Sequence, residues 1–175
     1  SHPYKEFYIL ENNNPHPRTL LIPKAIYFKN DEKILDYMKS KDFDFEKEIL
    51  LVKDSSKNKE NSGNNFKISS NIGKAEIVEY KPNMVKIMAF TKESAYLLLC
   101  DTWFEGWEAS IDGKKTDVIR GDYNFRAVYL PSGKHQVIFS FTHPGFYIGI
   151  ITSFLSFSLI IALNLFFKKD ADHKK

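Results

Sequence analysis

A long uncharged stretch near the C-terminus constrains this chain more than any other feature. Residues 146–167 contain no Asp, Glu, Lys or Arg. As a helix they would be about 33 Å long, and the hydrocarbon core of a bilayer is roughly 30 Å thick. The sequence therefore predicts a transmembrane helix over residues 144–167.

The charges on either side of this stretch predict its orientation. Lys168 and Lys169 follow it at once, whereas His143 is the nearest ionisable residue before it. Because Lys and Arg gather in cytoplasmic loops, we expect a cytoplasmic basic tail over residues 168–175. The domain at residues 19–143 is then expected outside the cell membrane.

Small residues within the apolar stretch predict a packing face. Gly145, Gly149 and Ser153 recur at every fourth position, and Ser156 adds a hydroxyl. Such residues let a second helix approach closely. We expect this helix to be the last of a bundle, so its partners are other transmembrane helices of the same protein or complex.

The region before the span has the pattern of an antiparallel β fold. Residues 96–102 form a continuous apolar run, typical of a strand buried on both faces. Residues 107–111 alternate apolar and polar, and Asp112-Gly113 follows with the sequence of a type I′ turn. We therefore expect a hairpin between residues 107–111 and 115–120.

The remaining elements complete a mainly β domain. Pro23 interrupts the apolar residues 19–28 and predicts an edge strand at best. Asn30 or Asp31 can cap a short amphipathic helix over residues 31–41. The expected fold is an antiparallel β-sandwich with one short N-terminal helix, followed by a single C-terminal transmembrane helix. Further strands are expected at 48–53, 75–80, 83–90 and in a last strand whose Val137, Phe139 and Phe141 share one face.

Two polar segments are expected outside the core. Residues 1–18 are Pro-rich and predict a linker, and residues 54–65 contain no apolar residue and predict a surface loop. The chain starts with Ser-His-Pro-Tyr and without Met, so we expect a piece of a longer protein.

Composition excludes several classes of site. The net charge is +3 and no basic cluster with exposed aromatic residues occurs, so no nucleic-acid partner is expected. Cys100 is the one cysteine and lies in an apolar run, so we interpret it as a small core residue. His135 and His143 have no third ligand in the pattern, and no phosphate loop or nucleophile elbow occurs. We expect no cofactor and no metal.

The loop after residues 96–102 gathers carboxylates and aromatic rings, as carbohydrate sites do. Asp101, Glu105 and Asp112 could supply acid and base groups, with Trp107 beside them. The alternative, which we favour, is that these carboxylates stabilise turns and that no residue is catalytic. Flat rings can stack on sugars, so Trp103, Phe104 and Tyr123 are the candidate residues for contact with a glycan.

Two arginines near the next turn allow a second pair of interpretations. Arg120 and Arg126 surround Asp122 and could bind a phosphate or a carboxylate ligand. We favour an internal Arg–Asp pair that braces the turn.

An ordered set of short motifs resembles the C-terminal end of the YfhO-like bacterial membrane proteins. The likeness is dense from Leu97 to Gly149, and the family often has Pro at the position of Glu105. The motifs are Leu97-Leu98-Leu99, Asp101-Thr102-Trp103, Gly106-Trp107-Glu108-Ala109, Asp112-Gly113-Lys114, Phe125-Arg126-Ala127-Val128, Pro131-Ser132-Gly133-Lys134-His135 and Gly149.

The resemblance implies a function for the parent protein. The family looks like multi-spanning glycosyltransferases of the GT-C type, which use a lipid-phosphate-linked sugar and act on cell-envelope polymers. The catalytic acidic residues implied by the family would lie outside this chain. A membrane-anchored module that binds a partner protein or a carbohydrate is the alternative.

Overall fold

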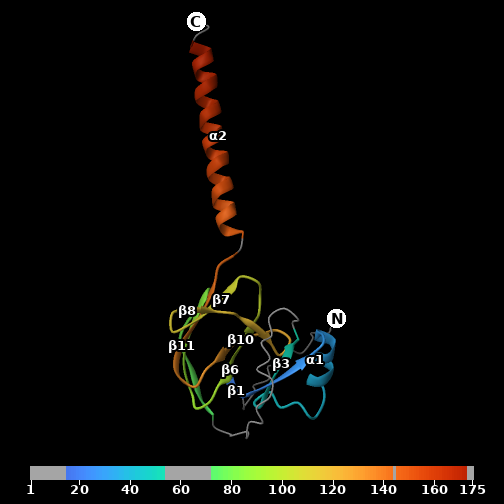
Figure 1. The fold of residues 1–175 in the computed structure, drawn as a ribbon. Helices are drawn as coiled ribbons and strands as arrows, with labels where there is room; N and C mark the ends of the chain where they lie inside the picture. Colours follow the sequence, from blue (N-terminus) through green and yellow to red (C-terminus); the bar gives the residue numbers. More distant parts are fainter. Residues whose placement is uncertain (1–14, 54–71, 144, 173–175) are drawn as a thin grey trace, which may run out of the picture.

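The computed structural model describes residues 15–53, 72–143 and 145–172. In these residues two β-sheets form one domain, with a short helix at its side and a long C-terminal helix that projects away from it (Figure 1). The predicted mainly β fold with two sheets, a short helix and an apolar C-terminal helix is confirmed. The loop predicted at 54–65 and most of the predicted linker lie outside the described residues. The elements are β1 Thr19–Ile22, β2 Lys24–Phe28, α1 Asp31–Met38, β3 Glu48–Val52, β4 Gly73–Lys81, β5 Met84–Thr91, β6 Ala95–Thr102, β7 Trp107–Ile111, β8 Lys114–Thr116, β9 Ile119–Gly121, β10 Phe125–Leu130, β11 Gly133–Phe141 and α2 Phe146–Asp172.

The first sheet has six strands in the order β1-β6-β10-β9-β3-β2. Its two edge strands, β1 and β2, are separated in the chain by Pro23 alone. The sheet must therefore curl until its edges are close together. The single edge strand predicted over residues 19–28 is thus two strands. Because β2 pairs with β3 in parallel, the sheet is also not wholly antiparallel.

The second sheet has five strands in the order β4-β5-β11-β7-β8. Asp112 and Gly113 join β7 to β8 with φ values of 50° and 78°, so the predicted type I′ hairpin is confirmed. Its second strand was predicted too long, because β8 ends at Thr116 and β9 belongs to the six-stranded sheet.

Strand β6 lies between two apolar clusters, as its continuous apolar run predicts. Leu97 and Leu99 point into the cluster between the two sheets, together with Ile87 and Phe139. Leu98 points the other way, into a second cluster within the curl of the six-stranded sheet. Each of these five side chains is at most 1 % exposed, so the domain is organised around β6.

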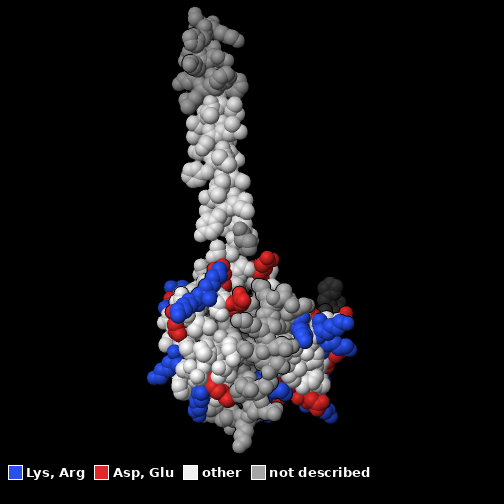
Figure 2. Space-filling model, viewed as in Figure 1, with Lys and Arg blue, Asp and Glu red and all other residues white. Residues whose placement is uncertain are grey.

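The two helices differ in what surrounds them. The side-chain oxygen of Asn30 accepts from the backbone N–H of Lys33 and caps α1, whose Ile34 is buried in the domain. Residues Phe146–Leu163 of α2 have a mean hydropathy of 2.2 and no burial, which makes α2 long and apolar enough to cross a membrane. Figure 2 shows Lys, Arg, Asp and Glu over the domain and none along residues Phe146–Leu163 of α2. The helix continues past Phe167, where the predicted span ends, to Asp172.

Candidate functional site

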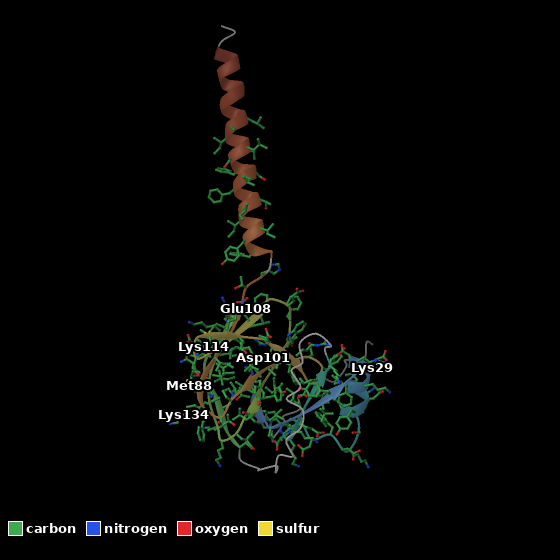
Figure 3. All side chains as sticks on the ribbon, viewed as in Figure 1. Lys29, Met88, Asp101, Glu108, Lys114 and Lys134 are labelled. Carbon is green, nitrogen blue, oxygen red and sulfur yellow. The ribbon has the colours of Figure 1, made fainter. Side chains whose placement is uncertain are left out.

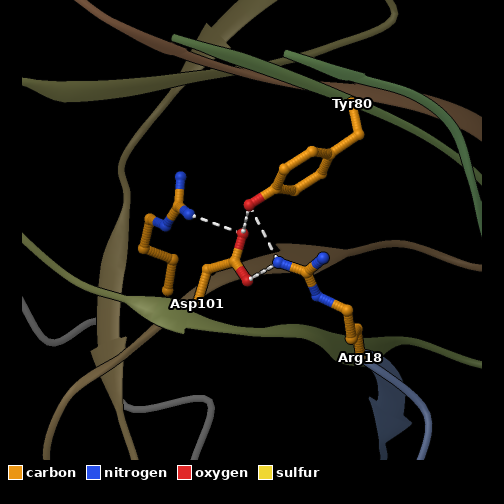
Figure 4. Close-up of polar contacts among 4 residues, drawn as sticks. Arg18, Tyr80 and Asp101 are labelled. Atoms are coloured by element: carbon orange, nitrogen blue, oxygen red, sulfur yellow. Dashed lines mark hydrogen bonds and ion pairs between the residues drawn. The ribbon is translucent and has the colours of Figure 1, made fainter. Parts of the chain in front are cut away.

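The densest polar cluster of the described chain centres on Asp101, at the end of β6 (Figure 4). Its Oδ1 accepts from Nη2 of Arg18 at 2.5 Å. Its Oδ2 accepts from Nη2 of Arg126 at 2.9 Å and from the Tyr80 hydroxyl at 3.2 Å. Nη2 of Arg18 also donates to the Tyr80 hydroxyl at 2.8 Å. Arg18 precedes β1, Tyr80 lies on β4 and Arg126 lies on β10, so one carboxylate joins both sheets.

Arg126 is the most deeply buried member of this cluster. Its side chain is 4 % exposed, and that of Asp101 is 9 % exposed. Burial lowers the pKa of Arg126, and the neighbouring Asp101 opposes this change. Nε and Nη1 of Arg126 have no hydrogen-bond partner, but the guanidinium lies 3.6 Å from the centre of the Trp107 ring. The electron-rich ring face therefore takes the place of an acceptor.

This geometry favours a structural role for Asp101. A general acid or a nucleophile needs an oxygen that can reach a substrate. Both oxygens of Asp101 are instead held by three donors, two of them cationic. Asp101 is therefore positioned to hold the ends of β1, β4, β6 and β10 together.

Asp112, a second candidate carboxylate, stabilises the β7–β8 turn. Its Oδ1 accepts from the backbone N–H of Gln136 at 2.8 Å, and its Oδ2 lies 2.7 Å from Nδ1 of His135. The hydrogen bond with His135 lowers the pKa of Asp112. The third candidate, Glu105, is exposed in the β6–β7 turn.

The two arginines form internal pairs, but not with the predicted aspartate. Nη2 of Arg120 donates to both carboxylate oxygens of Asp31, at 2.6 and 2.9 Å, and Arg126 binds Asp101. Asp122 lies instead beside β3, where its carboxylate accepts from the backbone N–H of Leu50 at 2.8 Å. Burial raises the pKa of Asp122 to about 6. The prediction that an Arg–Asp pair braces the turn at Asp122 is therefore wrong in its partner.

The three aromatic residues predicted to contact a glycan lie on neighbouring turns. The backbone N–H of Trp103 donates to the carbonyl of Asn124 at 2.7 Å, which ties the turn after β6 to the turn before β10. Phe104 is 61 % exposed and Tyr123 is 40 % exposed. Trp103 is half-buried, with the Arg120 guanidinium 5.7 Å from its ring centre. Glycan contact by these residues stays a prediction.

The sequence interpretation missed two members of the Asp101 cluster, Arg18 and Tyr80. Arg18 is 83 residues from Asp101 in the chain, and Tyr80 is 21 residues from it. The sequence around Arg18 is typical of a linker, and Tyr80 occupies an ordinary position in a predicted strand. No local pattern connects either residue with Asp101.

The hydroxyl groups on α2 are satisfied by the helix itself. Ser153 Oγ donates to the carbonyl of Gly149 at 2.8 Å, and Ser156 Oγ donates to that of Thr152 at 2.8 Å. Gly145 precedes the helix, and its carbonyl accepts from the N–H of Gly149. The packing face predicted from Gly145, Gly149, Ser153 and Ser156 therefore stays a prediction, and its polar atoms do not require a partner.

Comparison with known proteins gives one match. A family model described as bacterial membrane protein YfhO matches residues 42–153, from the segment before β3 into the first part of α2. Comparisons with curated proteins and with solved structures give no match. The matched residues include Tyr80, Asp101, Trp107 and Arg126 of the polar cluster.

Proposed function

Because this chain belongs to the YfhO family of bacterial membrane proteins, we propose that it forms the outward-facing C-terminal domain and last span of a multi-spanning member. The domain itself is not catalytic. It supports a parent protein that transfers sugar from a lipid-linked donor to a cell-envelope polymer. The domain is expected to lie outside the membrane, with the residues after α2 in the cytoplasm.

The observation that carries this proposal is that two of the three candidate carboxylates, Asp101 and Asp112, are bound within the fold. Asp101 binds two arginines, and Asp112 binds His135 and a backbone N–H. These contacts join strands and turns, which is what a supporting domain requires. The same observation favours a parent protein whose reactive residues lie elsewhere.

The orientation can be tested by thiol labelling in intact cells. Cys100 is the one cysteine of this sequence, so the labels are introduced in a Cys100→Ala background in which any cysteines elsewhere in the parent protein are also replaced. Lys134→Cys, on the exposed surface of β11, is expected to react with a membrane-impermeant maleimide in intact cells. Lys174→Cys is expected to react only after lysis. The reverse pattern would refute the outward-facing placement.

A glycan role can be tested by titration of the full chain in detergent with cell-wall polymers. The expected result is saturable binding that Trp103→Ala weakens. Lys134→Ala is the matched surface control, because Lys134 is exposed on another part of the domain. Equal binding by the native chain and Trp103→Ala would remove Trp103 from the contact set. No binding at all would favour the alternative, a module that docks a protein in an envelope complex.

A further inference from the structure

The turn at residues 103–106 is joined to the segment that leads into α2. The N–H of Thr142 donates to the carbonyl of Gly106 at 3.2 Å. The rings of Phe104 and Phe141 have centroids 6.4 Å apart. Phe141 is the last residue of β11, and the membrane-spanning segment begins at Phe146. In Figure 1 this turn lies at the end of the domain nearest α2.

The connection between β11 and α2 is too short to let the domain move far from the bilayer. Phe146 follows Phe141 by five residues, so even an extended chain would span only about 17 Å. The connection is not extended, because the N–H of Phe146 donates to the carbonyl of His143 at 3.0 Å. If Phe146 lies at the edge of the hydrocarbon core, the connection passes through the headgroup layer, which adds roughly 5–8 Å on each side.

An exposed aromatic ring lies in the turn at residues 103–106. Phe104 is 61 % exposed, more than any other large apolar side chain in the described part of the β domain. Trp103 beside it is half-buried. On surfaces that lie against a membrane, Phe, Trp and Leu side chains bury in the boundary between headgroups and acyl chains, where the apolar group leaves water.

We propose that the turn at residues 103–106 rests on the headgroup layer of the membrane that α2 crosses, with the Phe104 ring as its anchor. The occupant of this surface is thus lipid. The turn carries Glu105 and no cation, so the contact does not depend on anionic lipid. This assignment takes Phe104 out of the predicted glycan-contact set and leaves Trp103 and Tyr123 in it.

The structure also supplies a matched control. Strand β11 runs toward α2, and Phe90 pairs with Lys134 at its far end. Lys134 precedes Phe141 by seven residues, or roughly 24 Å along a strand. Figure 3 shows Lys134 farther from α2 than Glu108, which lies near the turn. Phe90 is 43 % exposed, so it offers the same side chain in water.

The test uses the full chain in phosphatidylcholine nanodiscs that contain a lipid with a nitroxide on its headgroup. Trp103 and Trp107, the two tryptophans, report contact through quenching of their fluorescence. We expect the nitroxide lipid to quench the native chain. We expect Phe104→Ser to lower the quenching constant at least twofold, and Phe90→Ser to leave it unchanged.

Two results would overturn the proposal: absence of quenching in the native chain, or equal quenching in the native chain and Phe104→Ser. The native measurement needs no variant, so it stands even if a variant folds poorly. The proposal requires only that α2 crosses a membrane. It does not depend on which side the domain faces or on any glycosyltransferase activity, so it can fail or succeed independently of the proposed function.

Discussion

Two Arg–Asp pairs in this domain have the same chemistry and different surroundings. In the pair between β6 and β10, the side chains of Arg126 and Asp101 are 4 % and 9 % exposed. In the pair between β9 and α1, those of Arg120 and Asp31 are 34 % and 39 % exposed. The second pair has more hydrogen bonds, because Nη2 of Arg120 donates to both oxygens of Asp31. Burial, and not the number of bonds, separates the two pairs.

This difference in burial determines how much each pair contributes to the stability of the fold. An exposed pair gains little, because water solvates both ions when the pair is broken. A buried pair is different, because removal of one partner leaves the other charge without solvent or counter-ion. Arg126 already lacks acceptors for Nε and Nη1, so it depends on Asp101 and on the Trp107 ring. The packing where β1, β4, β6 and β10 meet therefore depends on Asp101.

Asp101→Ala is expected to have the largest effect on this comparison. It leaves Arg126 buried without its counter-ion and should lower the free energy of unfolding by about 3–5 kcal/mol. The measurement is urea unfolding of the full chain in detergent, followed by tryptophan fluorescence. A loss below about 1 kcal/mol would mean that the buried pair behaves like an exposed one.

Trp107→Ala tests whether the ring replaces the missing acceptors of Arg126. The ring also packs against Phe141, with centroids 5.4 Å apart. We expect a loss of about 3–4 kcal/mol, near the low end for a large aromatic residue because Trp107 is partly exposed. Thermal melting by circular dichroism measures it. An unchanged melting temperature would place Trp107 outside the core.

Asp122→Asn extends the comparison to a buried carboxylate that forms no ion pair with the residues that the structure describes. The pKa of Asp122 is raised to about 6 from an ordinary value of 3.8. The folded state thus binds the proton more tightly, so this group's contribution is complete below about pH 3.8 and is lost as the pH rises through 6.

The native chain should therefore lose up to about 3 kcal/mol between pH 4 and pH 7 through this group. Asn keeps an acceptor for Leu50 and suits the φ of 47° at this position, so Asp122→Asn should remove that loss. Unfolding at several pH values checks this. Parallel pH curves for the native chain and the variant would contradict the raised pKa.

Asp31→Ala is expected to have the smallest effect. It removes the exposed partner of Arg120 and should cost at most about 1 kcal/mol. Asp31 also lies in the first turn of α1, where an acidic residue favours the helix, so a small loss is expected rather than none. A loss as large as that of Asp101→Ala would remove the distinction between the two pairs.

The features that were predicted correctly from the sequence are those set by residues close together in the chain. The type I′ turn at Asp112-Gly113, the cap at Asn30 and the apolar run of β6 are local signals, and each is confirmed. The split at Pro23 was not predictable in this way. β1 pairs with β6 and β2 pairs with β3, at opposite edges of a curled sheet, and no local pattern specifies these partners.

The candidate site shows the same limit. Asp122 lies close to Arg120 and Arg126 in the sequence, so the sequence predicted an internal Arg–Asp pair that braces this turn. It could not identify the aspartates, since Asp31 is 89 residues from Arg120 and Asp101 is 25 residues from Arg126. Which charges meet is decided by strand order, and strand order depends on the whole core.

The most direct test of the structural role of Asp101 is a double-mutant cycle with Arg126. Asp101→Ala, Arg126→Met and the double variant are compared with the native chain by urea unfolding, and the same cycle is made for Asp31 and Arg120. We predict a coupling energy of about 2–3 kcal/mol for the buried pair and less than about 1 kcal/mol for the exposed pair. Equal, small coupling in both cycles would contradict the account, because Asp101 would then not hold the domain together.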